Sequence, residues 1–111
     1  MIKSMKVFLC MPYSKSMNIR KSEEIAKSYR REVSDTVPGV NHSIVNPIPR
    51  SPEYYAKLQK LSDLIWYLNE SDCAFFTKGW ENDTNCQIIN TICLNYGIRR
   101  YYHNEEDYPY E

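Results

Sequence analysis

The spacing of apolar residues along the chain predicts strands that alternate with helices. Short apolar runs predict strands over residues 5–10, 42–45, 72–77 and 98–102. Apolar residues three or four positions apart predict helices over 18–33, over 53–70, and from about Cys86 to Tyr96, before Gly97. The second helix shows its apolar face at Tyr54, Leu58, Leu61, Ile65 and Leu68. This order predicts an α/β three-layer sandwich with four parallel strands, or five, covered by helices on both faces.

The length of 111 residues allows one domain with one core. We expect this domain over residues 1–102, followed by an acidic, Tyr-rich tail over 103–111. Fourteen basic and fourteen acidic residues cancel, which argues against a general nucleic-acid-binding protein. No apolar run approaches the roughly 20 residues of a membrane span, so we expect no membrane partner and a cytoplasmic location.

The four cysteines contain no Cys-x-x-Cys pair, and the chain has only two histidines. This spacing predicts no metal site, and we expect no cofactor. Because three of the cysteines lie in apolar runs, we expect reduced thiols packed as small core residues.

Ligands of parallel α/β sheets bind beyond the carboxyl ends of the strands, which directs attention to the loops after Cys10, Asn46 and Thr77. With only three glycines, the chain has neither a Walker-type phosphate loop nor a glycine-rich dinucleotide fingerprint. Any ligand site at this edge must therefore use other side chains.

Four short motifs occur in a family-like order along residues 5–102. They are Val7 to Tyr13 at the end of the first strand, Asn46-Pro47 after the second, Asp63 to Leu68 running towards Asp72, and Gly79-Trp80-Glu81 after the third. Together they resemble the nucleoside 2-deoxyribosyltransferase-like family, in a small and poorly characterised branch. The resemblance implies a flavodoxin-like strand order, a nucleoside or nucleotide ligand and chemistry at the N-glycosidic bond. It also implies a homodimer or larger homo-oligomer.

The resemblance assigns catalytic roles to carboxylates, and here the chain departs from the family. The family's nucleophilic Glu falls at Ile89, which cannot attack a sugar, and the Ser and Gly before it are replaced by Asp83 and Asn85. Either Glu81 or Asp83 could supply the carboxylate instead, or the register could shift by a few residues. Asp63 matches a second acidic residue of the family, although a surface helix position explains it equally well.

The candidate ligand-binding residues come from the three loops, and each has a structural alternative. They are Tyr13, Ser14, Asn46, Gly79 and Trp80. Trp80 could stack on a base or anchor its loop against Tyr67 or the helix that follows. Tyr13 could offer its hydroxyl to a sugar or phosphate or simply pack, and Ser14 belongs to a polar turn. Asp72, at the start of a strand, is expected to bond backbone amides.

The tyrosines near the end of the chain are open to two interpretations. Tyr101, Tyr102, Tyr108 and Tyr110 suit a subunit contact, or a partly ordered tail that covers the edge of the last strand.

Two functional hypotheses follow from these residues. In the first, the protein binds a nucleoside or nucleotide and, if active, acts on its N-glycosidic bond. In the second, Ile89 marks a catalytically silent member that sequesters a nucleotide, such as a signalling one, or serves as a protein-interaction module.

Overall fold

A computed structural model describes residues 4–12, 19–39, 41–46 and 57–103 of the chain. The elements follow in the order β1 (Ser4–Cys10), α1 (Ile19–Thr36), β2 (Asn41–Val45), α2 (Lys57–Asn69), β3 (Cys73–Phe76), the short 3-10 helix η2 (Trp80–Asn82), α3 (Thr84–Tyr96) and β4 (Arg99–Tyr102). The predicted alternation is confirmed. The main difference is that α1 continues to Thr36, because Val33 and Val37 both reach the core.

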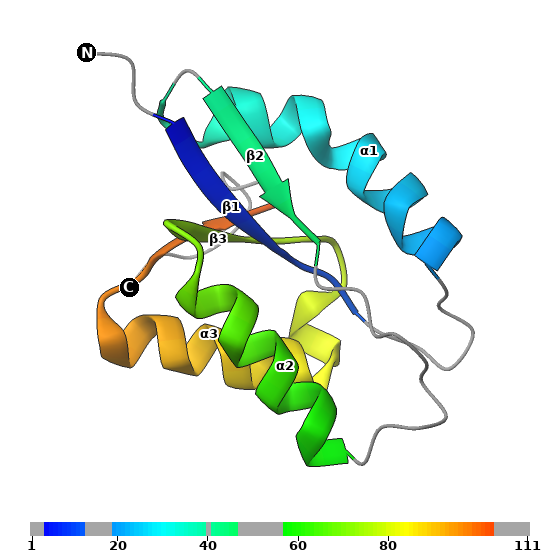
Figure 1. The fold of residues 1–111 in the computed structure, drawn as a ribbon, viewed down its shortest axis with the longest axis vertical. Helices are drawn as coiled ribbons and strands as arrows, with labels where there is room; N and C mark the ends of the chain where they lie inside the picture. The colour runs from blue at the N-terminus through cyan, green and yellow to red at the C-terminus, as the bar shows by residue number, and fades with distance from the viewer. Residues whose placement is uncertain (1–3, 13–18, 40, 47–56, 104–111) are drawn as a thin grey trace.

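The four strands form one parallel sheet in the order β2-β1-β3-β4. This is the flavodoxin-like order, with β1 and β3 at the centre and β2 and β4 at the edges. Helix α1 covers one face of the sheet, while α2 and α3 cover the other (Figure 1). The protein is therefore an α/β three-layer sandwich, as the sequence predicts.

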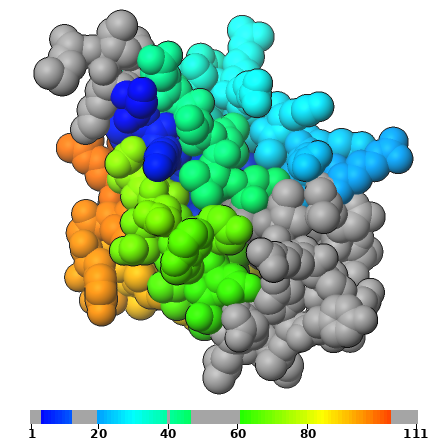
Figure 2. All heavy atoms as spheres, in the orientation of Figure 1, coloured from blue at the N-terminus to red at the C-terminus, as the bar shows by residue number. Residues whose placement is uncertain are grey.

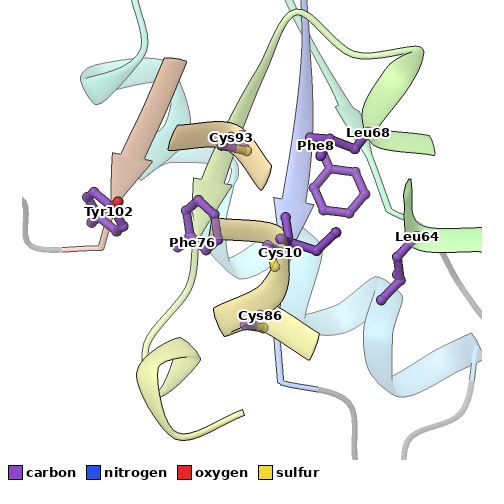
Figure 3. Packing of buried hydrophobic residues seen from close by; sticks show 10 residues of the cluster. Phe8, Cys10, Leu64, Leu68, Phe76, Cys86, Cys93 and Tyr102 are labelled. Atoms are coloured by element: carbon purple, nitrogen blue, oxygen red, sulfur yellow. The ribbon is translucent and has the colours of Figure 1, made fainter. Parts of the chain in front are cut away.

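The sheet separates two apolar clusters, because successive side chains of a strand point to opposite faces. Phe8 and Cys10 of β1 pack under α2 and α3, together with Phe76 of β3 (Figure 3). Val7 and Leu9 pack under α1. All four β3 residues are fully buried, which explains the continuous apolar run of this central strand.

The apolar face of α2 differs by one position from the expected stripe. Leu64 and Leu68 are buried, whereas Ile65 is 38% exposed. Leu61, Leu64 and Leu68 are spaced by three and four residues, so this set turns one face of α2 towards the sheet. The predicted residues Tyr54 and Leu58 lie where the structure describes no side chains.

Helix α3 ends as the sequence predicts but buries a narrower face. Gly97 has a φ of 70° and closes the helix in the left-handed conformation. Cys86, Ile89 and Cys93 are buried, whereas Tyr96 is 78% exposed. Tyr96, which marks the predicted end of the helix, therefore lies off its buried face.

Candidate functional site at the carboxyl edge of the sheet

The segments that leave the strands meet at one edge of the sheet. The Thr77 N–H donates to the Cys10 carbonyl at 3.0 Å, and the His103 N–H donates to the Phe76 carbonyl at 2.9 Å. A Cβ atom added to Gly79 would lie 3.6 Å from Cγ of Pro12, so the segments after β1 and β3 touch. Gly79 also has a φ of 87°, which side chains other than glycine adopt only with strain.

Trp80 follows Gly79 and packs into the layer beneath α2 and α3. Its ring centroid lies 5.1 Å from that of Phe76 and 5.2 Å from that of Tyr102. The Tyr102 hydroxyl in turn donates to Oδ1 of Asn90 on α3 at 2.6 Å. Trp80 is thus an aromatic anchor of its loop, but it packs against β3 and β4 rather than against Tyr67.

The carboxylate of Asp83 caps helix α3. Its Oδ2 accepts a hydrogen bond from the Cys86 N–H at 2.9 Å, which satisfies one of the free amides of the first helical turn. Glu81 lies on η2 with an exposed side chain, and its backbone carbonyl accepts from the Gln87 side-chain amide. Of the two replacement carboxylates, Glu81 is therefore the more accessible.

Ile89, which the resemblance aligns with a nucleophilic Glu, is fully buried in the cluster between the sheet and helices α2 and α3. Asp63 is half-buried on α2 and directly precedes the buried Leu64. Asp63 and Trp80 thus belong to helical elements on the same side of the sheet, with the core between the sheet and these helices.

Asn46, by contrast, lies on the α1 side of the sheet. It comes two residues after Ile44, which packs in the cluster beneath α1. Both residues line a hollow of about 320 Å³ between β2 and α1, whose lining consists of Glu23, Ala26, Lys27, Arg30, Ile44 and Asn46. Figure 2 shows α1 and the edge strand β2 side by side at the surface. Asn46 and Trp80 therefore do not share this hollow.

The side-chain amide of Asn46 is buried, yet neither Oδ1 nor Nδ2 has a hydrogen-bond partner among the described residues. Leaving such a group unpaired costs about 1–3 kcal/mol, so it calls for a specific explanation. An amide can donate and accept at the same time. Both atoms are shielded from solvent, so a ligand in the hollow satisfies them only when the Asn46 side chain turns towards it.

Lys27 and Arg30 were not predicted as ligand-binding residues, because charged residues on an amphipathic helix usually face solvent. The available signal was their spacing. Glu23, Ala26, Lys27 and Arg30 occur at positions i, i+3, i+4 and i+7 and so share one face of α1. Only the position of β2 shows that this face borders a hollow.

A second polar group missed by the sequence analysis joins α1 to the end of the sheet. Nδ1 of His103 lies 2.8 and 3.0 Å from the two carboxylate oxygens of Glu32. Tyr29 meets the His103 ring edge-on at 5.6 Å, and its hydroxyl accepts from the Lys78 N–H at 3.0 Å. The sequence had assigned His103 to the tail, where nothing indicated a partner 71 positions away.

Three other predicted residues lie away from this edge or outside the described part of the chain. Tyr13 and Ser14 fall in residues 13–18, which the structure does not describe. Asp72 sits at the amino end of β3, where its Oδ2 accepts from the Lys6 N–H at 2.7 Å. The expectation that Asp72 bonds a backbone amide is confirmed.

All four cysteines are buried free thiols, as the sequence predicts. Burial raises the pKa of Cys73 to about 11 and that of Cys93 to about 12. A hydrogen bond with Cys10, together with burial, raises the pKa of Cys86. Such protonated thiols are poor nucleophiles and poor metal ligands. In the described ranges, no three His, Cys, Asp or Glu residues cluster in a way that could hold a metal ion.

None of the described helices combines the length and the apolar character needed to cross a membrane. Comparison of the chain with protein-family models, with curated proteins and with solved structures finds no match.

Proposed function

We propose that this protein binds a nucleoside or nucleotide at the carboxyl edge of its sheet, as its resemblance to the 2-deoxyribosyltransferase-like family implies. The observation that carries the proposal is the buried, unpaired amide of Asn46, which borders a hollow at the end of β2. Its paired donor and acceptor match the hydrogen-bonding edge of a base or the hydroxyls of a sugar.

If the protein also acts on the N-glycosidic bond, Glu81 is the more accessible of the two replacement carboxylates. Its side chain is exposed beside the ends of β1 and β3, whereas the Asp83 carboxylate is bonded to the start of α3. A ligand held at Asn46 would have to extend across the carboxyl edge of the sheet to reach Glu81, because the hollow lies on the α1 side and Glu81 follows Trp80 on the other side. Asp63 would then assist by protonating the departing base or positioning the sugar.

A second candidate function is sequestration of the ligand without chemistry. Two observations favour it: Ile89 occupies the nucleophile position inside the core, and Asp83 serves as a helix cap. A hydrocarbon at that position binds no oxocarbenium-like centre.

The binding proposal is tested by calorimetric titration with deoxynucleosides and their monophosphates. Asn46→Ala should weaken binding about tenfold, because a ligand group would then lose its partner. Asn41→Ala is the matched control, since Asn41 is exposed at the opposite end of the same strand. Absence of binding to every nucleoside and nucleotide, or equal binding by Asn46→Ala and the unaltered protein, would contradict the proposal.

Chromatographic detection of released base separates the two candidate functions. Base release that is lost in Glu81→Gln, with ligand binding retained, would support the enzyme. Binding without any base release would support sequestration.

The expected homodimer and the cytoplasmic location belong to the same proposal. Exposed apolar side chains on α2 and α3, including 59% exposed Trp66 and 60% exposed Leu94, support a contact between subunits. Four free thiols suit a reducing compartment. Light scattering of the purified protein would measure the oligomeric state, and a monomer at all concentrations would contradict the dimer.

A further inference from the structure

We infer that Lys27 and Arg30 form an anion subsite in the hollow beside Asn46, so that the bound ligand carries a phosphate group. The inference rests on the proposed function and makes it more specific, because it separates phosphorylated from unphosphorylated ligands. The subsite lies between α1 and the edge strand β2, on the face of the sheet opposite Trp80.

The charges of Lys27 and Arg30 are not used by the rest of the described structure. Neither residue takes part in the ion pairs found within the described ranges. The neighbouring arginines of the same helix behave differently, since Arg20 pairs with Glu24 at 3.4 Å and Arg31 approaches Asp35 at 4.0 Å. The positive charges of Lys27 and Arg30, which border the hollow, are thus available to bind a ligand.

The lining of the hollow combines these cations with groups of other chemistry. Arg30 offers a planar fork and Lys27 a compact charge, the two ways in which proteins hold phosphate oxygens. Ala26 and Ile44 supply apolar surface, which strengthens nearby electrostatic interactions by excluding water. Glu23, the one carboxylate among the described lining residues, is suited to accept from sugar hydroxyls.

Asn46 completes the subsite from the strand. Its buried amide offers both a donor and an acceptor, whereas a phosphate group held by Lys27 and Arg30 offers mainly acceptor oxygens. A ligand that carries a second polar group beside the phosphate would match both sets of residues. A volume of about 320 Å³ is at the lower end of the range for small-molecule sites, roughly 300–1,000 Å³, so one compact ligand fills it.

Calorimetric titration at low ionic strength tests the subsite with three probes: a nucleoside, its 5′-monophosphate and inorganic phosphate. The monophosphate should bind about tenfold more tightly than the nucleoside. Lys27→Gln and Arg30→Gln should each weaken monophosphate binding about tenfold while leaving nucleoside binding unchanged. Added salt should weaken binding of the monophosphate more than binding of the nucleoside.

Arg31→Gln is the matched control, because it removes one positive charge from the same helix at a side chain that is 95% exposed and outside the hollow. Circular dichroism confirms that each variant is folded. If nucleoside and monophosphate bind equally, or if Lys27→Gln and Arg30→Gln act no more strongly than Arg31→Gln, the subsite is refuted while the proposed function stands.

The remaining outcomes are also distinguishable. Binding of inorganic phosphate that depends on Lys27 and Arg30, without binding of any nucleoside or nucleotide, would support the subsite and refute the proposed function. Absence of binding to all three probes would refute both.

Discussion

Asp83 shows how a single carboxylate can satisfy the demands of local structure. The helix that follows it begins with free amides, and its Oδ2 accepts from one of them, the Cys86 N–H. The negative charge also lies at the positive end of the helix dipole. The free amides of the helix start therefore explain this side chain, which the sequence had offered as a candidate catalytic carboxylate.

We predict that Asp83→Ala lowers the free energy of unfolding by about 1 kcal/mol, because the helix loses its cap, whereas Asp83→Asn retains most of the stability. Urea denaturation measures both variants. If base release is found, it should persist in Asp83→Asn. Loss of base release in that folded variant would instead identify Asp83 as a catalytic residue.

Ile89 presents the opposite case, a side chain whose role depends on the whole core. We predict that Ile89→Ala destabilises the protein by about 2–5 kcal/mol, and that Ile89→Glu destabilises it further by burying a charge. Placing a carboxylate at this position should therefore not create activity, which chromatographic detection of released base measures. Thermal denaturation measures the stability of the variants, with the exposed Thr91→Ala of the same helix as a control within about 0.5 kcal/mol of the unaltered protein. A stable, active Ile89→Glu would show that this position faces a site.

At the scale of elements, α1 is attached to the sheet by more than its apolar face. Its Tyr29 accepts from the Lys78 N–H just after β3, and its Glu32 meets His103 just after β4. These contacts fix the helix relative to the carboxyl edge of the sheet. The hollow between α1 and β2 depends on the same placement.

A double-mutant cycle on Glu32→Ala and His103→Ala should give a coupling energy of about 1 kcal/mol, because the pair is partly buried and bidentate. The control cycle on Arg31→Ala and Asp35→Ala should give almost none, since those side chains are 95% and 73% exposed and 4.0 Å apart. Unfolding in urea measures both. Equal coupling in the two cycles would contradict a specific role for His103.

At the scale of the whole molecule, the sheet divides the core into two clusters and places thiols in both. Cys73 lies in the cluster between the sheet and α1. Cys10, together with Cys86 and Cys93 of α3, lies in the cluster on the other face of the sheet (Figure 3). In the folded protein the pKa values of Cys73, Cys86 and Cys93 are raised, so these thiols stay protonated where an unfolded chain would ionise them. Folding is therefore linked to pH in the alkaline range.

We predict that the free energy of unfolding decreases as pH rises above about 9. The ordinary thiol pKa of 9.0 applies to the unfolded chain, whereas the folded pKa is about 11 for Cys73 and about 12 for Cys93. Between these limits the folded state binds more protons, so each thiol contributes a loss of up to about 1.4 kcal/mol per pH unit. Urea denaturation across this range checks the slope.

A Cys73→Ala/Cys93→Ala variant is the control for the thiols, because other groups also titrate in alkaline solution. Its stability should fall less steeply with pH than that of the unaltered protein. Identical slopes would show that the two thiols do not cause the effect.

The sequence by itself determined the order of the elements, the parallel sheet and the burial of the thiols, because these follow from local spacing and from the handedness of the connections. It also indicated Gly97, whose left-handed conformation is set at the helix end, and a backbone amide as the partner of Asp72, although the amide belongs to Lys6 on the neighbouring strand, 66 positions away. Even so, the sequence predicted Ile65 on the buried face of α2, where the structure has Leu64. Spacing alone therefore cannot decide between neighbouring faces of one helix.

Only the tertiary structure decided which side chains meet. From the sequence, Asn46 and Trp80 are both expected at the carboxyl edge of the sheet. The structure places them on opposite faces of the sheet. In the sequence, Lys27 and Arg30 resemble ordinary surface charges, and only the position of β2 beside α1 shows that they border a hollow. His103 has Glu32 as a partner because the end of β4 lies near α1. These contacts join residues far apart in sequence, and their geometry depends on how strands and helices pack rather than on any local pattern.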